Sequence, residues 1–401
     1  MALPQSRPGR CARIADGVRR KPERQAMTTI SYLETFLQAP APLLTGIDDL
    51  AIVRTAGGLM LYALTGSGGT VSGYDVDGAM ALVTQRGLPA GSGHPAPGQL
   101  GLIETADGPV LAVSGVPGAG LVGLSVGSAG GLGTLAPLAG GGSTFAALAL
   151  SGRPVGGTVV AATSDAGSGA LQLWQVAANG RFAALGQMTG DAAAELIARP
   201  ALAMLDQGGA RFLLAVSAER DSFSSYRIGP DGTPELVGTV GASAGLGIAA
   251  PQDIVTATVQ GRSYALLAAP GSSSIAVTEV GTDGRLRVTD LVADDLYSRF
   301  ERVTVLETRA VGDRVLIAAA GADDGITLMT LLPGGRLVRL ASFEARPGIP
   351  LMNPAALALD WAGGRIDIFA AAEGAAGLVR LRATPGVAAP ILQGGPGNDR
   401  L

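Results

Sequence analysis

The sequence contains very little of the two residue types that most often carry nucleophilic and acid–base chemistry. Cys11 is the only cysteine, so no disulfide can form within the chain to stabilise it. His94 is the only histidine, and it lies in a segment rich in glycine and proline, residues 91–97. One histidine could serve a single Ser/His/Asp triad, but no nucleophile motif accompanies it. We therefore predict that His94 is a solvated loop residue, and we assign no catalytic residue.

Long apolar runs and cofactor motifs are missing as well. Hydrophobic residues make up 47% of the chain, which is too apolar for general disorder. Residues 109–152 carry no charge, yet Pro117 and the glycines at 130–131 and 140–142 interrupt them. Because no stretch of about twenty apolar residues is unbroken, we expect no membrane span. The glycine-rich segments lack the Lys-Ser/Thr of a nucleotide-binding loop, and no zinc-ligand spacing occurs.

The first residues differ from the rest in charge. Residues 1–26 contain seven basic side chains (Arg7, Arg10, Arg13, Arg19, Arg20, Lys21 and Arg24) and two acids (Asp16 and Glu23). A nucleic-acid arm would need interleaved aromatic residues, and a secretory leader would need an apolar segment; neither is present. We expect residues 1–27 to be a disordered basic tail that need not belong to the native protein, with Met27 as a plausible start.

The remaining chain is acidic. It holds 22 of the 29 basic residues and 31 of the 33 acids, a net charge of −9. Such a body does not attract nucleic acid, so we predict no nucleic-acid partner. A surplus of carboxylates is compatible with a protein that functions in the presence of calcium.

The body of the chain is periodic. Glycines with turn-like neighbours, several of them Asp-Gly or Asn-Gly, stand 50 to 52 residues apart at positions 78, 130, 180, 232, 284, 335 and 386. Asp-Gly and Asn-Gly between apolar runs are strong hairpin signals, because both turn positions favour a positive φ. The spacing therefore predicts seven similar units, each with a hairpin at the same place.

Each unit contains four short β-type runs. An alternating run such as 254–259 is followed by a more continuously apolar one such as Tyr264–Ala269, then by a third such as 275–280 and a fourth such as 285–288. Helical periodicity is weak, and Tyr32–Leu37 and Asp191–Ile197 are the only short helix candidates. Four strands in each of seven units predict an all-β, seven-bladed β-propeller over residues 28–392, with the second run as the buried middle strand. Tandem sandwiches or a β-solenoid are the alternatives.

The last residues carry a possible metal motif. Gly394, Gly395, Gly397, Asn398 and Asp399, followed by Leu401, match the start of the nonapeptide Gly-Gly-x-Gly-x-Asp-x-(apolar)-x, whose successive turns bind calcium in a parallel β-roll. The glycines permit tight turns, the carboxylate of Asp399 is a hard oxygen ligand, and Leu401 would face the apolar interior. We predict that residues 393–401 begin such a roll, with calcium as cofactor. One turn cannot hold an ion alone, so more repeats would have to follow.

In these residues the chain resembles the hemolysin-type calcium-binding, or RTX, proteins. The resemblance covers about one nonapeptide and implies a secreted, extracellular protein exported by a type I system, whose calcium roll folds outside the cell. The propeller would then serve as a recognition or scaffold module for a protein or carbohydrate ligand. Two alternatives stay open: a lactonase-like propeller hydrolase, and a non-catalytic propeller that binds a protein partner.

Three pairs of adjacent acids and three aromatic residues are weaker candidates. Asp48-Asp49, Asp294-Asp295 and Asp323-Asp324 could be further calcium ligands on loops, but we interpret them as solvated turns. In particular, we place Asp323-Asp324-Gly325 in a hairpin between a second and a third strand. We expect Trp174, Tyr226 and Trp361 to pack within blades rather than to form a ligand platform.

Overall fold

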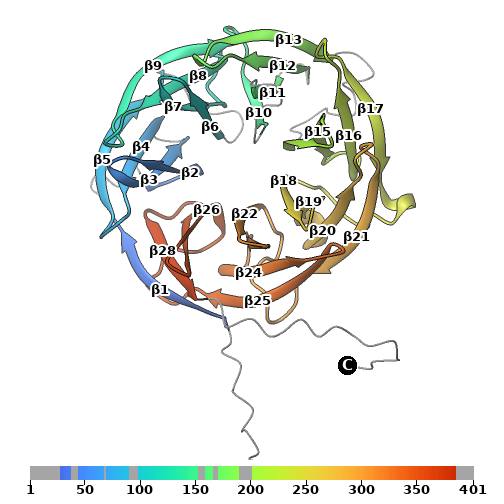
Figure 1. The fold of residues 1–401 in the computed structure, drawn as a ribbon. Coiled ribbons are helices and arrows are strands. Elements are labelled where there is room, and N and C mark those ends of the chain that lie inside the picture. Colours follow the sequence, from blue (N-terminus) through green and yellow to red (C-terminus); the bar gives the residue numbers. More distant parts are fainter. Residues whose placement is uncertain are drawn as a thin grey trace, which may run out of the picture. The chain divides into compact units, whose positions relative to one another are not determined.

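The protein is a seven-bladed β-propeller, as the sequence predicts. A computed structural model describes residues 28–37, 44–66, 69–89, 98–151, 159–165, 170–188 and 201–384. Seven antiparallel sheets of four strands stand around a central axis (Figure 1). Two short 3₁₀ turns, Ala242–Ala244 and Pro270–Ser272, are the helical elements that lie wholly within these ranges. The Asp191–Ile197 helix candidate lies outside the described residues.

The blades follow one another along the chain, and six of them are continuous in sequence. Blade 1 contains β2 (Ile47–Thr55), β3 (Gly58–Thr65), β4 (Thr70–Asp75) and β5 (Ala81–Gly87). Blade 2 contains β6 (Leu100–Thr105), β7 (Gly108–Val113), β8 (Leu121–Val126) and β9 (Leu132–Ala139). Blade 3 contains β10 (Phe145–Leu150), β11 (Val159–Asp165), β12 (Leu171–Val176) and β13 (Phe182–Met188). Blade 4 contains β14 (Ala201–Gln207), β15 (Ala210–Ser217), β16 (Ser222–Ile228) and β17 (Pro234–Val240).

The remaining three blades complete the ring. Blade 5 contains β18 (Asp253–Val259), β19 (Arg262–Ala269), β20 (Ser274–Val280) and β21 (Leu286–Ala293). Blade 6 contains β22 (Val305–Val311), β23 (Arg314–Ala320), β24 (Gly325–Leu332) and β25 (Arg336–Glu344). Blade 7 contains β26 (Pro354–Ala362), β27 (Arg365–Ala372) and β28 (Leu378–Thr384), and its outer strand is β1 (Thr29–Phe36).

The second strand is strongly apolar, and in blade 5, for example, it is buried on both faces. In β19, Tyr264 and Leu266 belong to the core shared with blade 6, whereas Ala265 and Leu267 belong to the core shared with blade 4. Successive side chains of a strand point to opposite faces, so a continuous apolar run serves both neighbouring blades. This explains why the second run of each unit does not alternate in polarity.

The ring is closed by a strand from the start of the chain, and here the helix predicted at Tyr32–Leu37 is wrong. These residues lie largely within β1, which pairs with β28 from Thr29 opposite Thr384 to Phe36 opposite Leu378. Phe36 packs edge-on against the ring of Tyr74 in blade 1. The outer strand of blade 7 therefore comes from the N-terminal side of the chain and not from residues after Gly386, which lies outside the described residues.

The predicted turn glycines do lie between third and fourth strands in six blades, but the turns are of another type. In blades 3, 4 and 5, Gly180, Gly232 and Gly284 have φ of 76°, 77° and 84°, whereas the preceding Asn or Asp does not have a positive φ. That side chain instead accepts a hydrogen bond from the amide two residues later, as Asp283 does from Arg285 at 3.0 Å. Only the glycine therefore needs the left-handed conformation.

Candidate functional site

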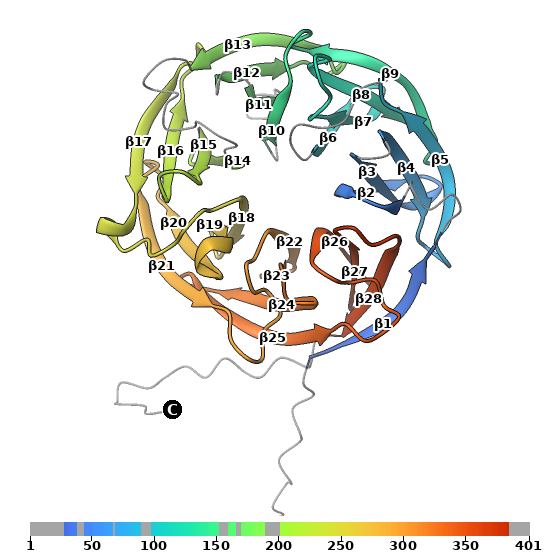
Figure 2. The ribbon, with the colours of Figure 1, turned by 180° about the vertical axis from the view of Figure 1, so that it is seen from behind.

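The two faces of the ring differ in their connections. Since each blade is an antiparallel meander, the loops between second and third strands and the connections from one blade to the next lie on one face, which we call the upper face. The turns between first and second and between third and fourth strands lie on the other, the lower face. The first strands surround the axis (Figure 2). All three acidic pairs singled out in the sequence lie on the upper face, at the start of β2, after β21 and between β23 and β24.

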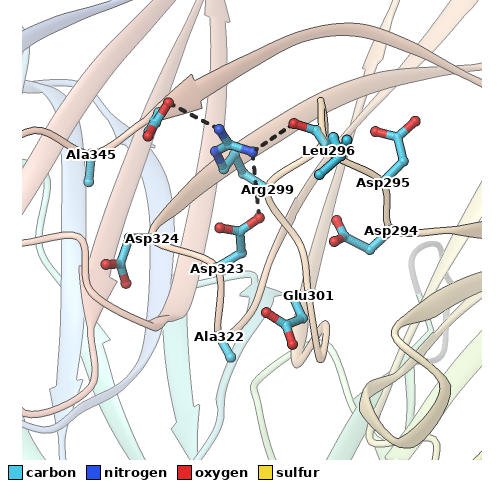
Figure 3. Close-up of a pocket in the computed structure, with 10 residues that line it drawn as sticks. Asp294, Asp295, Leu296, Arg299, Glu301, Ala322, Asp323, Asp324 and Ala345 are labelled. Carbon is cyan, nitrogen blue, oxygen red and sulfur yellow. Dashed lines mark hydrogen bonds and ion pairs between the residues drawn. The ribbon is translucent and has the colours of Figure 1, made fainter.

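Two of these pairs meet in one cavity. It has a volume of about 740 Å³ and lies between the connection from blade 5 to blade 6 and the β23–β24 turn (Figure 3). It is lined by six acids, Asp294, Asp295, Glu301, Asp323, Asp324 and Glu344, together with Arg299, Leu296, Ala322 and Ala345. We call it the acidic pocket.

The first acidic pair shapes the connecting loop. Asp294 accepts hydrogen bonds from the Ser298 hydroxyl at 2.7 Å and the Phe300 amide at 3.2 Å. Asp295 accepts from the amides of Tyr297 and Ser298, at 2.8 and 2.9 Å, and from Arg339. The amide of Tyr297 holds the pKa of Asp295 below its usual range, because it stabilises the ionised carboxylate.

The loop is anchored to the blade beneath it. Phe300 is buried in the core between blades 5 and 6, and the Ala322 amide donates to the Glu301 carbonyl at 2.7 Å. Gly321 permits this approach, since a Cβ there would lie 2.8 Å from the Arg302 carbonyl oxygen. The two walls of the acidic pocket are thus held together by backbone contacts rather than by side chains alone.

Arg299 is the one basic residue that lines the acidic pocket. Its guanidinium donates to Glu344 at 3.0 Å and lies 3.7 Å from the Asp323 carboxylate (Figure 3). It also donates to the carbonyl of Ser298 at 2.7 Å. The hydrogen bond to Glu344 raises the pKa of Arg299, which stays charged. Its amide donates to the Thr327 hydroxyl at 2.7 Å, so the backbone that carries this cation is fixed.

The carboxylates outnumber the cations that could neutralise them. Burial raises the pKa of Asp323, and the negative charges of Asp294, Glu301 and Asp324 add to this effect against the attraction of Arg299. Within the described part of the chain, the side chains of Glu301 and Asp324 accept no hydrogen bond. Six acids and one arginine line the acidic pocket, and Arg339 neutralises only Asp295 from outside the lining. The acidic pocket is therefore strongly negative and suits a cationic group.

A second set of acids lies on the first strands. Asp49 of β2 accepts from the amide of Leu50 and from that of Leu100 in blade 2, at 2.8 and 2.7 Å. Asp253 of β18 does the same with Ile254 and with Leu306 of blade 6, both at 2.8 Å. Each aspartate therefore joins the first strands of two neighbouring blades.

Glu307 of β22 is close enough to these two aspartates for their negative charges to raise its pKa. Burial raises the pKa of Asp49 to about 7, of Asp253 to about 6 and of Glu307 to about 8, and the like charges add to the shifts of Asp49 and Glu307. Unlike the two aspartates, Glu307 accepts no hydrogen bond within the described ranges. A carboxyl with this pKa is largely protonated at neutral pH and can exchange a proton there.

Some of the residues singled out in the sequence lie where they were expected, and others lie outside the described residues. Asp323-Asp324 form a turn between second and third strands, as predicted, and Tyr226, Trp174 and Trp361 pack against blade cores. Within the described ranges, no three His, Cys, Asp or Glu side chains are arranged to hold a metal ion. His94 and the predicted calcium ligands Gly394, Gly395, Gly397, Asn398 and Asp399 lie outside the described residues.

Sequence reasoning did not identify Asp253, Glu301, Glu307, Arg299 or Glu344. A usable signal was present for Asp253 and Glu307, because each is the only acid of its first strand. None was present for Glu344, which ends a polar outer strand.

Comparisons with known proteins support the fold and leave the function open. No protein-family model matches the chain, and no curated protein is similar to it in sequence. The crystal structure of a functionally unknown protein from Desulfotomaculum acetoxidans DSM 771 is similar, with a TM-score of 0.51 and 12% identity over 82% of this chain and 95% of that chain. At this identity the likeness concerns the fold alone. No helix in the described ranges is long and apolar enough to cross a membrane.

Proposed function

We propose that this propeller is a recognition module whose acidic pocket binds a cationic group of a partner, such as a lysine side chain of a peptide. The observation that supports this best is the surplus of carboxylates in a cavity of about 740 Å³ whose walls are fixed by backbone hydrogen bonds. A fixed wall costs less conformational entropy on binding than a loop that must first become ordered. Arg299 holds Glu344 and Asp323 in place and leaves Asp324 and Glu301 to meet the ligand.

The neighbouring surface indicates what accompanies the cationic group. Leu296, which lines the acidic pocket, is 89% exposed, and Tyr297 beside it is 71% exposed under the guanidinium of Arg339. Exposed apolar side chains beside a charged cavity are a common feature of protein-binding surfaces. We therefore propose that the ligand is a peptide in which a lysine stands next to an apolar residue.

The test is a titration of the full chain with a fluorescent Lys-Leu-Lys peptide at low and high salt. Neutralising two carboxylates with Asp323→Asn and Asp324→Asn together should weaken binding about two- to thirtyfold, because exposed ion pairs contribute roughly 0.2–1 kcal/mol each. Binding should weaken in high salt, which screens exposed charges.

Asp313→Asn is the control for the loss of a carboxylate outside the acidic pocket. Asp313 is exposed in the turn between β22 and β23, on the lower face of the same blade, so the substitution removes one charge without touching the acidic pocket. Equal affinity for wild type, the double variant and the control would refute the proposal. So would an affinity that does not change with salt.

Calcium binding by the C-terminal motif is a second proposal, supported by the string from Gly394 to Leu401. Because one turn cannot hold an ion alone, the test begins with the coding sequence after Leu401, where further nonapeptides are expected. Calcium titration by calorimetry of the protein that carries them, with wild type and Asp399→Asn, then tests the proposal. We expect wild type to bind calcium and Asp399→Asn to lose at least one binding event. If both proteins bind calcium equally, the ion is held elsewhere and the proposal is wrong. The proposed export to the cell exterior depends on this motif and is tested by locating the protein in culture fractions.

The hydrolase alternative has one supporting feature, the protonatable Glu307 near the propeller axis. A screen for lactone hydrolysis, repeated with Glu307→Gln, tests it directly. Turnover that is lost in the variant would favour an enzyme over a recognition module.

A further inference from the structure

Two arginines from different blades meet on one buried carboxylate near the lower face. Arg54 of β2 donates through Nη2 to Asp360 Oδ2 at 3.2 Å, and Arg309 of β22 donates through Nη2 to Asp360 Oδ1 at 3.2 Å. Asp360 belongs to β26, the first strand of blade 7, which stands between blades 6 and 1 in the ring. All three residues are two or three positions from the turn that ends their strand.

The burial of these groups is unequal. The side chain of Asp360 is 5% exposed, whereas those of Arg54 and Arg309 are 58% and 41% exposed. The carboxylate is thus enclosed by the protein, and each guanidinium is held at one edge while the rest of it faces solvent. Asp360 acts as a fixed support that sets the position of both cations.

The two arginines retain donors that the protein does not use. Each guanidinium has five N–H donors in a planar fork, and within the described ranges only Nη2 of Arg54 and of Arg309 makes a hydrogen bond. Two cations on one carboxylate leave a net charge of +1. Planar forks with free donors match the paired oxygens of a phosphate or carboxylate group.

Three further acids on the first strands, Glu307, Asp206 and Glu104, do not pair with these two arginines. Glu307 lies two residues before Arg309 and is attracted to it, but burial keeps it largely protonated at neutral pH. Asp206 of β14 is paired with Arg211 at 2.8 Å, and Glu104 ends β6 without a hydrogen bond to either arginine.

We infer that Arg54 and Arg309, supported by Asp360, form an oxyanion-binding site on the lower face, separate from the acidic pocket. The ligand is a small phosphate or carboxylate group, or such a group on a larger molecule. The propeller would then carry a cation-binding surface on one face and an anion-binding surface on the other.

The experiment titrates the full chain by calorimetry with inorganic phosphate in one arm and acetate in the other. We expect at least one anion to bind wild type, and Arg54→Gln or Arg309→Gln to weaken that binding about tenfold or more, because charge-assisted bidentate contacts are lost. Phosphate alone identifies a phosphate group and acetate alone a carboxylate, and either supports the site. Arg54→Lys keeps the charge without the fork and should bind with intermediate affinity.

Arg314→Gln is the control, since Arg314 is an exposed arginine at the start of β23 on the same face. Circular dichroism establishes that each variant is folded before it is titrated. Binding of neither anion to wild type overturns the inference, and so does equal weakening in the control and in the Arg54 and Arg309 variants. A purely structural role would lower the melting temperature of the Arg54 and Arg309 variants and leave anion affinity unchanged.

Discussion

The protonatable carboxyl of Glu307 gives the sharpest prediction about the stability of the ring. Replacing it with Gln keeps the size and polarity of the protonated acid and removes its ability to ionise. Burial raises the pKa of Glu307 to about 8, from 4.5 for an ordinary glutamate. Ionisation therefore favours the unfolded chain, and Glu307→Gln should stabilise the fold wherever unfolded glutamate is ionised.

The sign and size of the effect follow from proton linkage. Below pH 4.5 both states hold the proton and Glu307 contributes nothing. As the pH rises from 4.5 to 8, the unfolded state loses its proton first, so the free energy of unfolding of wild type falls, and above pH 8 the loss levels off. At pH 7 the difference is at most roughly 3 kcal/mol, since one pKa unit corresponds to about 1.4 kcal/mol. The partial exposure of Glu307 to solvent and its coupling to Asp49 and Asp253 reduce this figure.

The assay is denaturant unfolding of wild type and Glu307→Gln at pH 5, 7 and 8.5. The free energy of unfolding of the variant should exceed that of wild type by a small amount at pH 5 and by a larger amount at pH 8.5. Glu235 is exposed on the outer strand β17, so Glu235→Gln serves as the control. It should leave the free energy of unfolding unchanged at each pH. The reasoning is refuted if the gain from Glu307→Gln is the same at all three pH values.

Three further predictions concern the ring and the acidic pocket. Removal of residues 28–36 takes away β1 and leaves the edge of β28 unpaired, so we expect a lower melting temperature and self-association by size-exclusion chromatography. Phe300→Ala should lower the free energy of unfolding by about 3–5 kcal/mol in denaturant titrations, because it leaves a cavity between blades 5 and 6; a loss below about 1 kcal/mol would contradict the described packing. Gly321→Ala should weaken binding of the Lys-Leu-Lys peptide while the protein stays folded, since the added methyl group separates the two walls of the pocket; unchanged affinity would show that these backbone contacts do not shape the site.

The blade pattern could be predicted from sequence because it is local. A hairpin glycine such as Gly232 or Gly284 and a continuously apolar second strand recur at a fixed interval, and each signal lies within about ten residues. The closing strand could not be predicted in this way. Its apolar residues Tyr32, Leu33 and Phe36 are spaced as on a helix, and its partner β28 is some 350 positions away in the sequence.

The acidic pocket could be predicted from sequence only in part. The sequence predicts solvated turns at both acidic pairs, and Asp323-Asp324 does lie in a turn between β23 and β24. Asp294 and Asp323 line one cavity because the connection from blade 5 to blade 6 is held against these blades by Phe300, which is buried in the core between them. The meeting of Arg54 and Arg309 on Asp360 likewise requires three neighbouring blades to be in place, and no local pattern encodes it.

A crystal structure of the protein with the Lys-Leu-Lys peptide would show whether the acidic pocket binds a cationic group. We expect a lysine ammonium group within hydrogen-bonding distance of Asp323, Asp324 or Glu301, with the leucine against Leu296 or Tyr297. An ordered peptide bound elsewhere on the propeller, with no cation in the acidic pocket, would contradict it.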